Sequence, residues 1–176
     1  SLDELKDSDI LGELSTLHNN GVDLVEPSEL TASLKGRDKV YNQMQFMLKE
    51  ADNTFDLVTT DNGLERKADH LVRAFKKAYD RGVRIRIAIP GNEISDDILE
   101  LLSQYAEIKK MENIKARFAI ADGQEISFLL FHDEEVHPTY DVGVWVNTPF
   151  FSQAVESLFN IAWEDLPSLT VSTVSR

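Results

Sequence analysis

The sequence has no cysteine, little positive charge and no long hydrophobic run. Without cysteine there is no disulfide, no thiolate nucleophile and no cysteine-ligated zinc site. No apolar stretch approaches the ~20 residues that a membrane-spanning helix needs, and the N-terminus has no signal-peptide pattern. These absences predict a cytoplasmic protein with no membrane partner.

Acidic residues outnumber basic ones, with 31 Asp and Glu against 18 Lys and Arg, which gives a formal net charge of −13. Such a surface repels phosphate backbones and anionic lipid. We therefore expect this chain not to hold DNA or RNA by itself, although a local basic pocket remains compatible with the total. The 176 residues allow one domain with an added arm, and a start at Ser1 rather than Met suggests a fragment of a longer protein.

Hydrophobic periodicity predicts a helical arm and then a mixed domain. Apolar residues recur at helical spacing over 2–18, and a polar stretch with Pro27 follows over 22–35. Further helices are predicted from Gly36, from Leu64, from Ser95 and from Thr148 with Pro149. Strands are predicted at 55–60, 83–89, 114–121, 125–132 and 141–147.

The strand, helix and strand over 55–89 imply parallel pairing with a right-handed crossover. The predicted fold class is therefore α/β, with a mixed, partly parallel sheet flanked by helices. The predicted domains are an arm and connector at 1–35, a layered domain at 36–167 and a loose tail at 168–176. In the last helix, seven apolar residues are assigned to the core: Phe151, Ala154, Val155, Leu158, Phe159, Ala162 and Trp163.

One predicted strand carries two cations and ends near a carboxylate. Alternation places Lys115 and Arg117 on the same face, and Asp122-Gly123 offers a tight hairpin turn. Thr59, Thr60 and Asn62 follow the carboxyl end of another strand, where ligands of α/β sheets often bind.

The spacing Lys115-x-Arg117-x4-Asp122 resembles the His-x-Lys-x4-Asp motif of the phospholipase D superfamily, with lysine for the histidine and arginine for the lysine. The surroundings are similar in order: Gly-Arg-Asp at 36–38, Thr-Thr at 59–60, Arg-Gly at 81–82, and Val-Trp-Val-Asn-Thr-Pro at 144–149. Over about residues 30–167 the sequence resembles the phospholipase D-like domain of archaeal TrmB-like transcriptional regulators.

This resemblance implies an effector-sensing and dimerisation domain. It implies a homodimer, a small-molecule or anionic effector, and DNA binding only through an upstream winged helix that this sequence does not contain. Residues 1–20 would be the end of the linking helix. A purely structural oligomerisation domain that binds no ligand is an alternative function.

The residue types argue against phospholipase D chemistry, which needs one imidazole as nucleophile and a second to protonate the leaving group. A protonated Lys115 has no lone pair to attack phosphorus. At the positions where the superfamily has a downstream Gly-Ser and then Asn, this sequence has Leu129, Leu130 and His132. We therefore predict that the chain is not an enzyme; the alternative is a phosphodiesterase or nuclease with a degenerate motif.

A binding role for the same residues is open, because an arginine at 117 can bind a phosphate oxygen bidentately. The predicted ligand site comprises Lys115, Arg117, Asp122, Thr59, Thr60 and Asn62. The competing interpretation is surface ion pairs and a plain polar turn. We predict no cofactor and no metal, since the loop with His132, Asp133, Glu134, Glu135 and His137 matches no zinc spacing and reads as a solvated charged loop.

Overall fold

The structure, a computed structural model, describes residues 30–113 and 115–171. The chain divides into two units, residues 1–30 and 31–176, so apart from Leu30 everything below belongs to the second unit. The amphipathic helix predicted over 2–18 lies outside the described residues.

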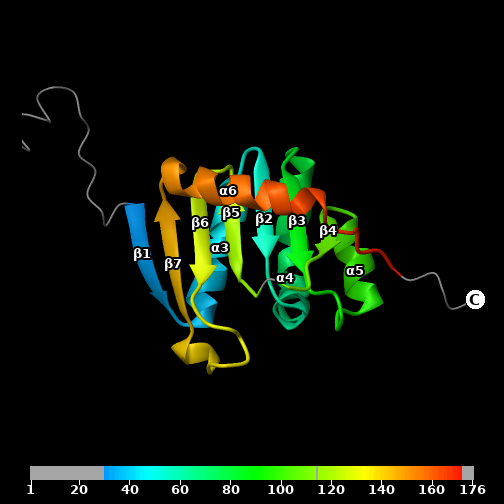
Figure 1. Cartoon of the computed structure of the whole chain (residues 1–176), viewed down its shortest axis with the longest axis horizontal. Helices are drawn as coiled ribbons and strands as arrows, with labels where there is room; N and C mark the ends of the chain where they lie inside the picture. The colour runs from blue at the N-terminus through cyan, green and yellow to red at the C-terminus, as the bar shows by residue number, and fades with distance from the viewer. Residues whose placement is uncertain (1–29, 114, 172–176) are drawn as a thin grey trace, which may run out of the picture. The chain divides into compact units, whose positions relative to one another are not determined.

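A seven-stranded mixed sheet forms the centre of this unit, in the order β1-β7-β6-β5-β2-β3-β4 (Figure 1). The strands are β1 (Thr31–Lys35), β2 (Thr54–Val58), β3 (Arg84–Ile89), β4 (Glu107–Lys110), β5 (Phe118–Ala121), β6 (Glu125–Leu129) and β7 (Val142–Asn147). The neighbours β2, β3 and β4 are parallel, whereas β5, β6, β7 and β1 pair antiparallel. The predicted α/β class with a partly parallel sheet is confirmed.

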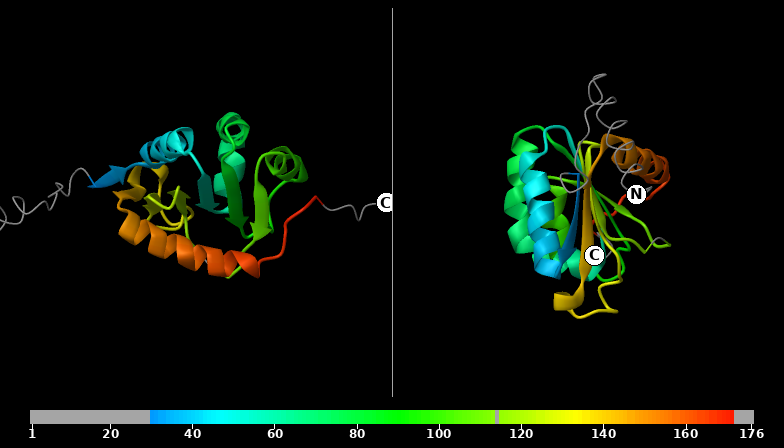
Figure 2. Two further views of the ribbon diagram at one scale, coloured as in Figure 1. Left: turned by 90° about the horizontal axis from the view of Figure 1, so that it is seen from above. Right: turned by 90° about the vertical axis from the view of Figure 1, so that its left-hand side faces the viewer.

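Helices cover both faces of the sheet (Figure 2). One face carries α3 (Arg37–Glu50), α4 (Asp61–Asp80) and α5 (Asp96–Ser103), and the other carries α6 (Pro149–Glu164). A short 3₁₀ helix, η1 (Pro138–Tyr140), precedes β7. The β2-α4-β3 unit has the parallel pairing that its sequence pattern predicts.

Strand alternation divides the core into two parts. Phe55 and Leu57 of β2, like the isoleucines of β3, belong to the larger cluster with α3, α4 and α5. Val58 and Ala88 belong to a smaller cluster with Phe159 and Trp163 of α6. Because alternate residues point to opposite faces, the charged residues Asp56 and Arg86 lie on the α6 side of the sheet.

Two strands were missed by the sequence reading. Residues 31–35, expected in a connector, form β1, and 107–110 form β4. Both lie at sheet edges, and β1 alternates only between exposed and half-buried residues. Such strands lack the apolar alternation that marks a buried strand.

Three predicted boundaries were also wrong. β5 begins at Phe118 rather than at residue 114, and β6 ends at Leu129 rather than at residue 132. The helix expected after Gly63 begins at Asp61, because Thr60 caps it by accepting the Gly63 N–H at 3.0 Å. Gly63 is needed there, since a Cβ would lie 2.9 Å from the hydroxyls of Thr59 and Thr60.

The core assignment of the last helix was partly wrong. Phe151 is 42% exposed and Leu158 is 68% exposed, while the helix buries Ser152, Phe159 and Trp163. The apolar residues of α6 surround much of the helix, so their spacing alone does not choose the buried side.

The tail was expected to be loose from residue 168, but its described part follows β4. Leu169 donates its N–H to the carbonyl of Ile108 at 2.9 Å and packs against the larger core cluster. None of the helices in the described residues is long and apolar enough to cross a membrane.

Candidate functional site

Arg117 is buried at the end of β5 rather than displayed on a strand face. It is 5% exposed, and its guanidinium meets the carboxylate of Asp141, with Nη2 3.0 Å from Oδ1 and Nη1 3.1 Å from Oδ2. Its Nε donates to the carbonyl of Phe131 at 3.1 Å. The side chain is therefore held by the segments on both sides of η1.

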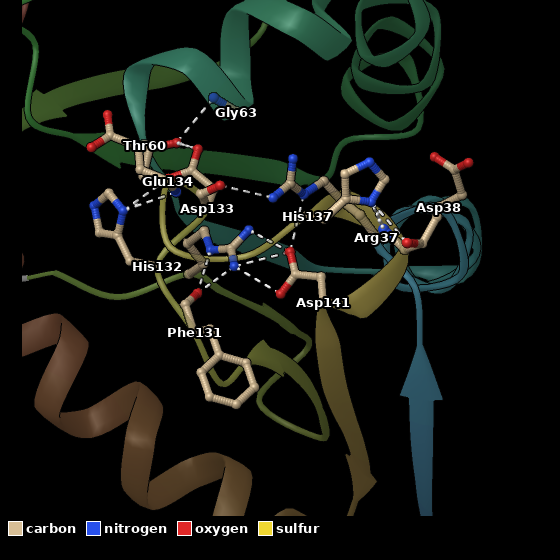
Figure 3. Close-up of polar contacts among 12 residues, drawn as sticks. Arg37, Asp38, Thr60, Gly63, Phe131, His132, Asp133, Glu134, His137 and Asp141 are labelled. Carbon is tan, nitrogen blue, oxygen red and sulfur yellow. Dashed lines mark hydrogen bonds and ion pairs between the residues drawn. The ribbon is translucent and has the colours of Figure 1, made fainter.

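Asp141 binds a second arginine in the same buried space. Nε of Arg37 donates to its Oδ2 at 3.0 Å, and Nη2 of Arg37 donates to the carbonyl of Asp133 at 3.0 Å (Figure 3). Arg37 is 5% exposed and Asp141 is fully buried. Since Arg37 opens α3 and Asp141 precedes β7, the pair fixes the start of that helix against the sheet. We call Arg37, Arg117, Asp133 and Asp141 the arginine network.

Asp133 extends the network to α4. Its Oδ2 accepts from the hydroxyl of Thr60 at 2.8 Å and from Nη2 of Arg66 at 3.2 Å. Nδ1 of His132 lies 3.3 Å from Oδ1 of Asp133, but this nitrogen accepts the N–H of Glu134 at 3.2 Å. In that tautomer it has no proton to donate to Asp133. In the described part of the chain, no three His, Asp or Glu side chains converge as metal ligands would.

A pocket of about 360 Å³ lies beside the network. Its wall combines hydroxyls, charged groups and apolar side chains: Thr59, Thr60, Pro90, Glu112, Lys115, Ala116, Arg117, Leu129, Leu130, Phe131, His132 and Glu135. Lys115 is exposed, and within residues 30–113 and 115–171 no hydrogen bond or ion pair engages its ammonium group. The volume suits a small ligand.

The structure brings together four of the six predicted site residues. Lys115, Arg117, Thr59 and Thr60 line this pocket. Asn62 is exposed on the first turn of α4 and is outside the lining. Whether any of them binds a ligand stays a prediction.

Asp122 lies at the other end of β5. Its φ is +56°, and its carboxylate accepts the backbone N–H groups of Asp52, Asn53 and Thr54 at 2.7–2.9 Å. This carboxylate therefore ties the β5–β6 turn to the start of β2. It is separated from Arg117 by the length of the strand.

Sequence reasoning missed Arg37, Asp133 and Asp141 as site residues. Arg37 entered only as part of a helix start, Asp133 as part of a charged loop and Asp141 as a strand end. Arg37 and Asp141 are 104 positions apart, so no local spacing links them. The available signal was that each polar residue stands at a boundary of a predicted buried element.

A second buried ion pair lies under α6. Arg86 binds Asp56 through two bonds of 2.6 and 2.9 Å and also donates to Oδ1 of Asn160 at 2.7 Å. Burial raises the pKa of Asp56, and Arg86 opposes that shift. The pKa of the nearby Glu156 is also raised, first by burial and then by the charge of Asp56. These groups link β2, β3 and α6.

The family model described as "Transcriptional regulator TrmB, EBD N-terminal subdomain" matches residues 32–165. Among solved structures, TrmBL2, described as an archaeal chromatin protein with a novel mode of DNA binding, is similar with a TM-score of 0.64 and 22% identity. The match covers 93% of this chain and 64% of the TrmBL2 chain, so the present chain spans less than two thirds of that relative. A search of curated proteins gives no match.

Two further solved structures share the fold. Nuc, a phospholipase D family member from Salmonella typhimurium, has a TM-score of 0.62 and 12% identity, over 80% of this chain and 99% of its own. NucT from Helicobacter pylori has a TM-score of 0.62 and 12% identity, over 78% and 98%. At these identities the likeness concerns the fold, and it agrees with the resemblance that the sequence motif indicates.

Proposed function

Because the chain belongs to the TrmB family of transcriptional regulators, we propose that this domain senses an effector and forms dimers for such a regulator, and that it does not cleave phosphodiesters. DNA is bound by another domain of the full-length protein. The effector changes the arrangement of the dimer by binding one arrangement better than the other. That change alters the spacing of the DNA-reading domains.

The pocket at Lys115 is the main support for effector binding. An unpaired ammonium group and the hydroxyls of Thr59 and Thr60 line a hollow of about 360 Å³, and Arg117 is held at its wall by Asp141. Lys115, Thr59 and Thr60 are the candidate contacts to a small anionic effector. Asp122 and Asn62 lie outside the lining and are not included.

The chemistry of the pocket supports the absence of turnover. Lys115 occupies the position of the nucleophilic histidine in the phospholipase D motif. Arg117, two residues later, binds Asp141 and the carbonyl of Phe131. Leu129 and Leu130 occupy the wall where the superfamily has small polar residues. The second candidate, a phosphodiesterase with altered residues, would have to use Lys115 as a nucleophile with its amine deprotonated.

An exposed face of α6 supports dimerisation. Phe151, Ala154, Leu158 and Ile161 recur at steps of three, four and three residues, as at the contact positions of paired helices. Leu158 and Ile161 are 68% and 70% exposed. We call these four residues the α6 stripe.

A second copy of the chain is the partner that fits the stripe. From Phe150 to Trp163 the only charged residue is Glu156, whose Oε2 is buried. Two copies with a net charge of −13 each repel one another, so an uncharged strip is where they can approach most easily.

The α6 stripe borders the pocket. Phe151 and Val155 line a shallow apolar hollow together with Phe118, Phe128 and Leu129, and this hollow also contains Lys115 and Arg117. An effector held at Lys115 would therefore lie beside the surface that meets the second copy. This continuity supports coupling between effector binding and the dimer arrangement.

Thermal unfolding with a panel of phosphate, sugar phosphates, nucleotides and sugars tests effector binding. A compound at 100 times its dissociation constant should stabilise the protein by about 2.7 kcal/mol, and the shift should be lost in Lys115→Ala. Lys35→Ala, on the edge strand β1, is the matched control. No shift with any compound would favour the purely structural alternative.

A chromogenic phosphodiester tests the enzymatic alternative directly. We expect hydrolysis at the rate of a blank without protein. Turnover that disappears in Lys115→Ala would overturn the proposal that the domain is inactive.

A further inference from the structure

A groove between α3 and α4 gathers positive charge in a protein whose total charge is −13. The hollow has a volume of about 320 Å³. Its polar lining is Gln45, Lys49, His70, Arg73, Lys77 and Arg81. Its lining residues belong to α3, to α4 and to the C-terminal cap of α4, and these helices lie on the face of the sheet opposite α6 (Figure 2). None of the lining residues is shared with the pocket at Lys115.

Helical spacing builds this groove from two sides. Steps of three and four residues place His70, Arg73 and Lys77 along one face of α4, and Arg81, the C-terminal cap of the helix, continues this row. Lys49 projects from the last turn of α3, one turn after Gln45. The cations of the two helices therefore converge on a common hollow.

Within the described part of the chain, most of these cations have no carboxylate partner. Elsewhere the basic residues of α4 are paired: Lys76 with Asp80 at 2.9 Å, Lys67 with Asp38 at 3.7 Å. For Lys49, Arg73 and Lys77, no ion pair or hydrogen bond is present among the residues that the structure describes. In a chain with so many carboxylates, this local excess of positive charge without a carboxylate partner among the described residues is available to bind an anion.

Arg81 gives the groove a fixed cation. Its Nη2 donates to the carbonyls of Leu48 and Ala51 at 2.9 and 3.0 Å, at the end of α3. These bonds hold the guanidinium in place without neutralising its charge. A positioned charge loses less conformational entropy on binding an anion than a free side chain does.

We propose that the α3–α4 groove binds a compact, multiply charged phosphate compound of the tripolyphosphate or nucleoside triphosphate class. Guanidinium groups bind phosphate oxygens bidentately, and the lysines add point charges. The volume matches a small ligand. Double-stranded DNA fits less well, because a chain with a net charge of −13 repels a long phosphate backbone that extends beyond the groove.

The site is independent of the proposed effector pocket. The two hollows share no lining residue. Arg73 and Lys77 lie about 18 and about 24 Å along the helix axis from Asp61, the first residue of α4, which follows the pocket residue Thr60. Failure at one site therefore leaves the other untouched, and Lys115→Ala should bind the groove ligand as the unaltered chain does.

Isothermal titration calorimetry with sodium tripolyphosphate and with ATP tests the groove. We expect saturable binding that weakens at least about tenfold in Arg73→Gln/Lys77→Gln and falls with added salt. The matched control is Lys76→Gln, next to Lys77 but paired with Asp80, which should bind within about twofold of the unaltered chain. Circular dichroism of each variant verifies that the helices remain folded.

Three results would overturn the proposal. The first is no binding heat with either compound at millimolar concentration. The second is an equal loss in Lys76→Gln, which would indicate a general charge effect. The third is tighter binding of a short DNA duplex through Arg73 and Lys77, which would make the groove a DNA contact.

Discussion

Asp141 is the single residue on which the arginine network depends, since its carboxylate meets both Arg37 and Arg117. Breaking a buried ion pair by removing one partner leaves an uncompensated charge and costs about 3–5 kcal/mol. We expect Asp141→Asn to lower the free energy of unfolding by that amount in urea denaturation. The same substitution at Asp38, whose side chain is 93% exposed, should cost less than about 1 kcal/mol.

A similar loss in both variants would contradict the structural role given to Asp141. It would mean that the network contributes no more than a surface pair does. The loss of Asp141 would also affect the pocket, because Asp141 holds Arg117, which forms part of the pocket wall.

Glu156 makes stability depend on pH. Burial and the charge of Asp56 raise the pKa of its carboxyl in the folded protein. A raised folded-state pKa contributes stability that is fully present below the ordinary value of 4.5 and is lost as the pH rises through the folded value. The unfolding free energy should therefore decline over that window.

Glu156→Gln should reduce this decline and raise the unfolding free energy at pH 7, by less than about 1 kcal/mol because the carboxyl is only partly buried and solvent screens its charge. Glu164→Gln, exposed on the same helix, is the control. Denaturation curves at several pH values measure both. An unchanged pH profile in Glu156→Gln would contradict the assignment.

At the scale of elements, α6 has two apolar sides, and its sequence does not indicate which side is buried. Phe159 and Trp163 enter the core, and Arg86 lies under them, with its Cζ 4.8 Å from the ring centre of Phe159. Leu158 and Ile161 face away from the protein. Which side is buried depends on the facing sheet, which no pattern within the helix encodes.

If the α6 stripe pairs two copies, Leu158→Glu should separate them, because it places a charge in the middle of the stripe. Sedimentation velocity should then show a monomer, with the fold retained by circular dichroism. Phe46→Glu on α3, where the side chain is 54% exposed, should leave the dimer intact. A dimer that persists in Leu158→Glu would place the interface elsewhere.

Local patterns predicted the elements whose signal is local. The β2-α4-β3 unit was recognised because the spacing of its apolar residues and the residues that end its helix indicate the same elements over 55–89. The start of α5 was recognised from Ser95, which accepts the N–H of Ile98 as an N-terminal cap does. β1 and β4 were missed because edge strands bury little. Thr59 and Thr60 were found because they follow the carboxyl end of a predicted strand. Lys115 and Arg117 were found from their alternation and motif spacing, although they precede β5 rather than lie within it.

The same reasoning could not find the contacts that depend on the tertiary fold. The arginine network joins the start of α3, at Arg37, to Asp133 and Asp141 between β6 and β7, about a hundred positions away. The basic groove joins Lys49 to residues of the following helix, and only the packing of α3 on α4 brings them together. Charges that pair or converge over such separations leave no periodic trace in the sequence.

For the whole molecule, a TrmB-family fold carries a pocket lined by Lys115 and Arg117 and, on an acidic protein, the α6 stripe, which has no charged residue. The dimer that we propose would connect these features, because an effector could act on distant DNA-reading domains only if the arrangement of two copies changed.

The mass of the chain in solution tests that claim most directly. Light scattering coupled to size exclusion, at micromolar concentration and moderate salt, should give twice the mass of a single chain. The full-length regulator should behave in the same way. A monomer for both proteins would contradict the account.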